Sequence, residues 1–138
     1  MDDYEKYLFR GKEKDSGKWI CGDLRHISDG HGGYILCIVD NTNGRNNDVT
    51  GVEVIPETVG RYTGSIDKNH IKIFEGDIVR AITHLTDIYV GAVTFENGAF
   101  WYKNWSWVKF GFKFEKSEVI GNIYDNPELL GGENNGNN

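Results

Sequence analysis

The stretch that decides the fold class lies in the second half of the chain, where two β-prone runs flank an Asn-Gly pair: Tyr89-Val90-Gly91-Ala92-Val93-Thr94-Phe95-Glu96, Asn97-Gly98 and Ala99-Phe100-Trp101-Tyr102. Asn-Gly between two such runs is the strongest short signal for a β-hairpin, because the type I′ turn needs a positive φ at both central residues. Residues 89–102 are therefore expected to form two antiparallel strands joined at Asn97 and Gly98.

Short apolar runs of similar length continue on both sides of this hairpin. They cover residues 71–74, 78–85, 107–114 and 119–124 in the second half, and residues 4–9, 18–23, 34–40 and 49–56 in the first half. Eighteen glycines and only two prolines favour strands joined by tight turns. We predict a mostly β protein in which residues 61–130 form a small SH3-like barrel, residues 1–60 form an N-terminal β-hairpin or sheet extension, and residues 131–138 form a disordered tail.

Charge and hydropathy exclude several classes of protein. The net charge is −6, from 15 basic and 21 acidic residues, and there is no basic tail, which disfavours binding to duplex DNA through its phosphates. No apolar stretch approaches the roughly 18 residues of a membrane helix, and the acidic N-terminus does not resemble a signal peptide. We therefore expect a cytoplasmic protein of a bacterial host, with no membrane partner and no cofactor.

The two cysteines are expected to be small buried hydrophobic side chains, because Cys21 and Cys37 lie in or beside apolar runs. With His26 and His31 they could in principle hold Zn²⁺ through two sulfurs and two imidazoles. Structural zinc sites usually hold their ligands in close pairs at tight turns, and these four residues are not spaced in pairs. We favour no metal site, with these four ligands as the alternative.

Several segments, in order along most of the chain, resemble the YopX family of phage and prophage proteins. The segments are Phe9-Arg10-Gly11-Lys12, Tyr62-Thr63-Gly64, Asp67-Lys68-Asn69, Phe74-Glu75-Gly76-Asp77-Ile78-Val79, Gly91-Ala92-Val93-Thr94-Phe95, Asn97-Gly98-Ala99-Phe100 and Val119-Ile120-Gly121-Asn122-Ile123-Tyr124-Asp125-Asn126-Pro127-Glu128-Leu129-Leu130. The resemblance implies a mostly β fold with an SH3-type barrel and an origin in a phage or an integrated element. It implies no catalytic residues.

The chain departs from the family pattern at two positions. His70 stands where the family usually has a turn glycine, and Ser65 stands where it usually has an aliphatic residue. These departures leave the shape of the turn at residues 67–70 open.

The most unusual feature of the sequence is its aromatic density, with eight aromatic residues among positions 100–114 and no acidic residue from position 97 to 114. Strict alternation of Phe110, Phe112 and Phe114 assigns these three rings to one buried face. The remaining tryptophans and the interleaved lysines form a candidate interaction surface, because exposed aromatic patches usually mark interfaces. Its residues are Trp101, Lys103, Trp105, Trp107, Lys109 and Lys113.

A catalytic reading is weaker. Glu75 and Asp77 could act as an acid and base pair or hold a metal for a hydrolase or nuclease, but Asp at a turn commonly binds local backbone amides instead. The four histidines have no serine or cysteine nucleophile at a recognisable spacing.

The sequence therefore favours a non-enzymatic phage or prophage accessory protein that binds a macromolecular partner through its β surface. The partner would be a host or phage protein, or a second copy of the chain. Single-stranded nucleic acid is the alternative, because bases stack on aromatic rings while lysines neutralise phosphates, as the 101–113 segment would allow.

Overall fold

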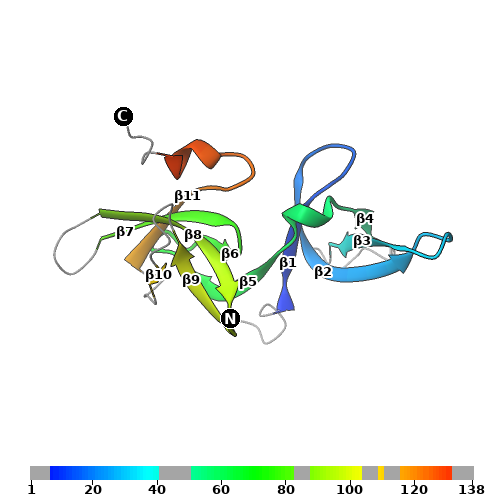
Figure 1. The fold of residues 1–138 in the computed structure, drawn as a ribbon, viewed down its shortest axis with the longest axis horizontal. Coiled ribbons are helices and arrows are strands. Elements are labelled where there is room, and N and C mark those ends of the chain that lie inside the picture. Colours follow the sequence, from blue (N-terminus) through cyan, green and yellow to red (C-terminus); the bar gives the residue numbers. More distant parts are fainter. Residues whose placement is uncertain (1–6, 41–50, 83–87, 104–108, 111–115, 132–138) are drawn as a thin grey trace. The chain divides into compact units, whose positions relative to one another are not determined.

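The computed structural model describes residues 7–40, 51–82, 88–103, 109–110 and 116–131, and its regular elements are β-strands with short 3-10 turns (Figure 1). The predicted mostly β class is confirmed. Across these described ranges, no helix is long and apolar enough to cross a membrane. The chain divides into two compact units, residues 1–62 and residues 63–138.

The first unit is an antiparallel sheet. Its strands lie in the order β4-β3-β2-β1, followed by the beginning of β5, and their bounds are β1 Phe9–Lys12, β2 Trp19–Ser28, β3 Tyr34–Val39, β4 Val52–Glu53 and β5 Gly60–Ile66. The predicted N-terminal hairpin is present, with Arg10 opposite Cys21, but its first strand is Phe9–Lys12 and so begins where the predicted run of residues 4–9 ends. A 3-10 turn, η2 (Pro56–Thr58), leads into β5, and Ile38 and Val54 are fully buried in this unit.

The second unit begins within β5 and contains a five-stranded antiparallel sheet in the order β10-β9-β8-β7-β11. The bounds are β6 Lys72–Phe74, β7 Asp77–Ile82, β8 Ile88–Glu96, β9 Ala99–Lys103, β10 Lys109–Phe110 and β11 Ser117–Asn122, with a final 3-10 turn, η4 (Pro127–Leu129). The core consists of Ile73, Val79, Val93 and Tyr102, against which Ala81, Tyr89, Phe100 and Val119 pack.

The hairpin predicted at Asn97 and Gly98 is confirmed. Glu96 lies opposite Ala99, and both turn residues have positive φ, 53° for Asn97 and 79° for Gly98. These are the backbone conformations that the Asn-Gly pair was expected to adopt.

The described strands do not close into the expected barrel, because the five-stranded sheet ends at β10 on one side and at β11 on the other. The outer edge of β11 is met by the turn after β5. Lys68 N–H donates to Ser117 O at 3.0 Å, and Val119 N–H donates to Asp67 Oδ2 at 2.9 Å. A loop and a side chain thus satisfy edge groups that a paired strand would otherwise satisfy.

Some expectations lie outside the described residues. These are the start of the first predicted strand, the Asn- and Gly-rich loop at residues 41–48, most of the aromatic run at residues 107–114, and the tail from residue 132.

Candidate interaction surface

The β8–β9 hairpin positions the first residues of the candidate surface. Trp101 lies opposite Thr94, and Lys103 lies opposite Ala92, so the register puts all four on the same face of the sheet. Tyr102 points to the other face and is 2% exposed in the core. Trp101 is half-exposed on its face, whereas Ala92 on that same face is only 7% exposed, so the exposed part of the face lies toward the turn.

The side chains of Trp101 and Lys103 both meet Glu96 at the end of β8. The Trp101 indole Nε1–H donates to Glu96 O at 3.0 Å, and Lys103 Nζ lies 3.5 Å from Glu96 Oε2. We call Thr94, Glu96, Trp101 and Lys103 the β9 face. In this face the Trp101 indole is held in one orientation with part of the ring exposed, and the charge of Lys103 is partly neutralised by Glu96.

A third candidate position joins this face through the backbone. Lys109 of β10 is the cross-strand partner of Lys103. The register thus brings the positions of Lys103 and Lys109 together beside Trp101. Trp105, Trp107 and Lys113 lie outside the described residues.

The core beneath β9 is chemically inert. Burial raises the pKa of the Tyr102 hydroxyl well above its usual range, and a hydrogen bond with the Ser117 side chain offsets this rise only in part. Burial also raises the pKa of Tyr89, whose ring lies 6.1 Å from that of Tyr102. Both phenols stay neutral near pH 7, so they supply packing and no negative charge.

The carboxylate of Asp77 has the structural role that its turn position indicated. The side chain is 2% exposed, and its Oδ2 accepts a 2.7 Å hydrogen bond from Phe74 N–H. This bond closes the turn between β6 and β7. Glu75, half-buried in the same turn, is two residues away.

Asp67 is a second buried carboxylate, whose role the sequence analysis missed. Its side chain is 3% exposed and accepts hydrogen bonds from the N–H groups of Asn69, Ile71 and Val119 at 2.8 to 2.9 Å. Burial alone would raise the pKa of Asp67, but these three donors and nearby His70 hold it below its usual value. The only sequence signal was an aspartate opening a polar turn.

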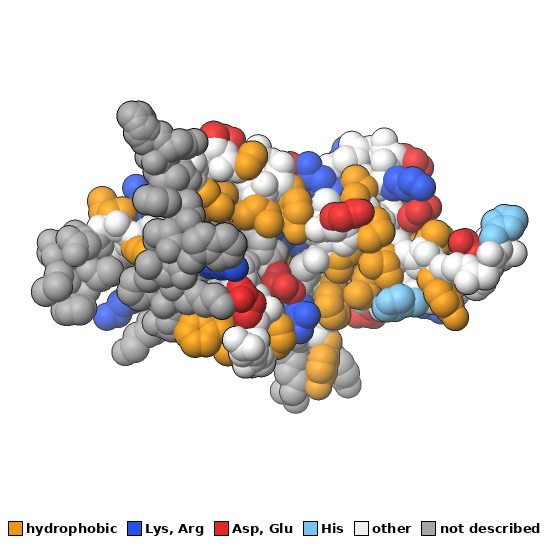
Figure 2. All heavy atoms as spheres, in the orientation of Figure 1, with side chains coloured by type: hydrophobic (Ala, Val, Ile, Leu, Met, Phe, Trp, Pro, Cys, Tyr) orange, Lys and Arg blue, Asp and Glu red, His pale blue; other side chains and the backbone are white. Residues whose placement is uncertain are grey.

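The four potential zinc ligands are not brought together. On adjacent strands His26 lies opposite Leu36 and Cys37 lies opposite Arg25, so the side chains of His26 and Cys37 point to opposite faces. His31 lies in an exposed turn, where its backbone N–H donates to Asp29 Oδ1 at 2.7 Å. Figure 2 shows the histidine side chains of the first unit apart from one another. Among the described residues, no group of three His, Cys, Asp or Glu side chains could hold a metal.

A cluster of two cations around a tryptophan on β1 and β2 was also missed. Arg10 lies 4.7 Å and Lys12 5.6 Å from the centre of the Trp19 ring. Cation–π contacts of this kind stabilise the pairing of the two strands. The sequence indicates this cluster only once the register of the hairpin is known, because that register puts Lys12 opposite Trp19.

Comparison with known proteins gives a family and a fold. The crystal structure of protein EF1440 from Enterococcus faecalis is similar at a TM-score of 0.54 and 20% identity, over 88% of this chain and 96% of that chain. At this identity the likeness shows the fold alone. No curated protein matches the sequence. The profile of the YopX protein family matches residues 8–131, nearly the whole chain, and the protein therefore belongs to the YopX family.

Proposed function

We propose that this protein is a non-enzymatic accessory protein of phage or prophage origin that binds a macromolecular partner through the β9 face. The observation that carries the proposal is the indole of Trp101, half-exposed and fixed by its bond to Glu96 O. A rigid, partly exposed tryptophan gives much contact area at little cost in side-chain entropy, which is why tryptophan is enriched at interface hot spots. The partner is a host or phage protein, or a second copy of the chain.

Binding is favoured over catalysis by what the buried carboxylates do. Both oxygens of Asp67 accept backbone N–H groups, from Ile71 in its own turn and from Val119 on β11, and Asp77 Oδ2 accepts the N–H of Phe74. Their chemistry is that of turn formation. We place the protein in the cytoplasm of the bacterial host and infer that its second unit is a variant of the SH3-like fold with an open sheet.

Single-stranded nucleic acid is the second candidate partner. Its support is the register that puts Lys109 opposite Lys103, so that two lysine positions accompany Trp101 on neighbouring strands. Aromatic rings interleaved with lysines suit stacked bases and their phosphates. The Glu96 carboxylate, 3.5 Å from Lys103 Nζ, opposes this reading because it repels phosphate.

The proposal is tested by the variant Trp101→Ala, with Lys14→Ala as control. Lys14 forms an exposed ion pair with Glu53 at 3.3 Å in the first unit, so its loss leaves the β9 face intact. Tagged wild-type protein and both variants are incubated with bacterial lysate, and the captured proteins are quantified beside the oligomeric state. We expect Trp101→Ala alone to lose the bound partner or the self-association. Equal capture by all three folded proteins, or a monomer that captures nothing, would contradict the proposal.

A further inference from the structure

Four exposed isoleucines gather at one end of the second unit. Among the described residues, the large hydrophobic side chains that are strongly exposed comprise two tyrosines of the first unit and four isoleucines of the second. The isoleucines are Ile66 (39% exposed), Ile71 (52%), Ile82 (62%) and Ile88 (66%). Isolated exposed hydrophobic residues are ordinary, but a group of them is the mark of an interaction surface.

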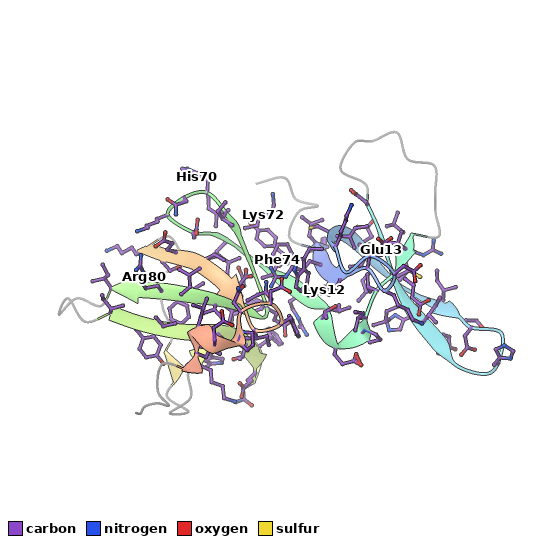
Figure 3. All side chains as sticks on the ribbon, turned by 90° about the horizontal axis from the view of Figure 1, so that it is seen from above. Lys12, Glu13, His70, Lys72, Phe74 and Arg80 are labelled. Carbon is purple, nitrogen blue, oxygen red and sulfur yellow. The ribbon has the colours of Figure 1, made fainter. Side chains whose placement is uncertain are left out.

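The backbone brings the four residues to the same end. Ile82, the last residue of β7, and Ile88, the first residue of β8, are direct cross-strand partners. Ser117 of β11 links this pair to the other two isoleucines. It lies opposite Ala81, the residue before Ile82. Its backbone oxygen accepts the N–H of Lys68, which lies in the turn between Ile66 and Ile71. Figure 3 shows His70 of this turn and Arg80 of β7 toward the same end, with Phe74 farther along the unit.

Among the described residues at this end, the exposed charged side chains are mainly positive. Glu118 of β11 is bridged by Arg80 at 2.5 Å and by Lys68 at 3.9 Å, so one carboxylate meets two cations. The side chains of Lys68 and Arg80 remain 51% and 47% exposed, against 28% for Glu118. Exposed Lys116 adds a further charge beside β11.

The turn that carries Ile66 and Ile71 is held in place by Asp67. Its carboxylate binds the N–H groups of Asn69 and Ile71 within the turn and that of Val119 on β11. A surface that is already ordered loses little entropy when a partner binds.

We propose that this isoleucine end, made of Ile66, Ile71, Ile82 and Ile88 with Lys68 and Arg80, is a docking surface for an acidic protein segment that carries apolar side chains. Charge complementarity selects the occupant: aliphatic groups cover the isoleucines, and carboxylates approach the cations around Glu118. The surface goes beyond the proposed function, which places binding at the β9 face of β8 and β9.

The test uses three fluorescein-labelled peptides and the full-length protein. One peptide alternates aspartate with leucine, the second replaces aspartate by lysine, and the third replaces leucine by serine. We expect fluorescence anisotropy to show saturable binding of the first peptide only, weakening as salt rises, because exposed ion pairs are screened. Equal binding of the lysine peptide, or no binding of the aspartate and leucine peptide, overturns the inference.

Variants locate the binding on the protein. Ile82→Ser with Ile88→Ser, and separately Lys68→Glu, should each weaken binding of the first peptide about tenfold, since interface anchors carry most of the affinity. Tyr34→Ser and Lys14→Glu are the matched controls, because Tyr34 is 73% exposed and Lys14 pairs with Glu53 in the first unit. Both controls, and Trp101→Ala, should bind normally. Loss of binding only in Trp101→Ala assigns the peptide to the β9 face and overturns the inference.

Two further measurements keep the result independent of any variant's stability. In the unmodified protein, the first peptide should shift the backbone amide resonances of Ile66, Ile71, Ile82 and Ile88. Shifts confined to other residues overturn the inference. If the protein instead sediments with anionic phospholipid vesicles, the surface binds a membrane. If it forms a dimer that Ile82→Ser with Ile88→Ser abolishes, the surface binds a second copy of the chain.

Discussion

At the scale of single residues, two positions of one turn govern the second unit. Asp67 is buried and binds three backbone N–H groups, while His70, three residues later, adopts a φ of 66°. The resemblance to the family implies a turn glycine at the position of His70, and this backbone conformation is the one that glycine adopts without strain. In this chain a histidine occupies the left-handed position of the turn.

Asp67→Asn should destabilise the protein by about 2 kcal/mol near neutral pH, because an amide NH₂ would face a backbone donor and leave it without an acceptor. We expect hydrogen exchange of the Val119, Asn69 and Ile71 amides to accelerate. Asp15→Asn, at an exposed position of the first unit, is the control and should behave as the wild type. Unchanged exchange at all three amides would contradict this role.

The same carboxylate predicts the direction of a pH effect. The pKa of Asp67 is lower in the folded protein than its usual value near 4, so the charged form is favoured by folding. Its stabilisation is complete above the unfolded pKa and is lost as pH falls through the folded pKa. The stability difference between wild type and Asp67→Asn should therefore shrink below about pH 4. A difference that is constant from pH 7 to pH 3 would show that the charge is not involved.

His70→Gly should raise the free energy of unfolding by up to about 1 kcal/mol. Relief of left-handed strain, roughly 1–2 kcal/mol, exceeds the added entropy of glycine in the unfolded chain, about 0.4–1 kcal/mol. Asn69→Gly is the control, because the neighbouring Asn69 does not have a positive φ and should only lose stability. Thermal unfolding measures the stability of both variants. Equal destabilisation of the two would refute the strain argument.

At the scale of elements, the β8–β9 hairpin links the turn, the core and the β9 face. Its turn residues have positive φ, its inward side chains include Val93 and Tyr102 of the core, and its outward residues include Trp101. The Trp101 indole bond to Glu96 O spans the turn. A change in the turn should therefore reach the candidate surface.

Gly98→Ala should cost about 1 kcal/mol of stability, because an alanine at a φ of 79° is strained although nothing lies within 4 Å of its added Cβ. Asn97→Gly, at a φ of 53°, should be close to neutral. Denaturant unfolding measures both. If Gly98→Ala were as stable as the wild type, the turn conformation would differ from the one described.

At the scale of the whole molecule, net charge and local charge point to different partners. A chain of net charge −6 repels nucleic acid at long range, while the Lys103 and Lys109 positions and the cations of the isoleucine end attract acidic groups locally.

A titration with a mixed-sequence single-stranded oligonucleotide separates the two proposed classes of partner. We expect no saturable quenching of tryptophan fluorescence at low or moderate salt, because Glu96 and the net negative charge oppose phosphate binding. The Trp101→Ala variant is the control for the source of any signal. Saturable quenching that weakens as salt rises would instead establish the nucleic-acid alternative.

Part of the candidate site could be predicted from local pattern. Alternation along residues 99–103 separates Trp101 and Lys103 from the buried Tyr102, and the turn position of Asp77 indicated its bond to a backbone amide. The pairing of Lys103 with Glu96 and the cation cluster at Trp19 needed the register of neighbouring strands. Side chains that meet across strands carry no fixed spacing in the sequence.

The sequence by itself determined the β class, the positions of most strands and the Asn97-Gly98 hairpin, because alternation and turn residues act over a few neighbouring positions. Only the tertiary structure shows that β5 is a strand, because its Gly60 and Arg61 become part of the sheet by pairing with Arg10 and Phe9. It also decided the role of Asp67, whose partner Val119 is 52 residues away. Which distant N–H group needs an acceptor depends on how strands are brought together, so no local pattern specifies it.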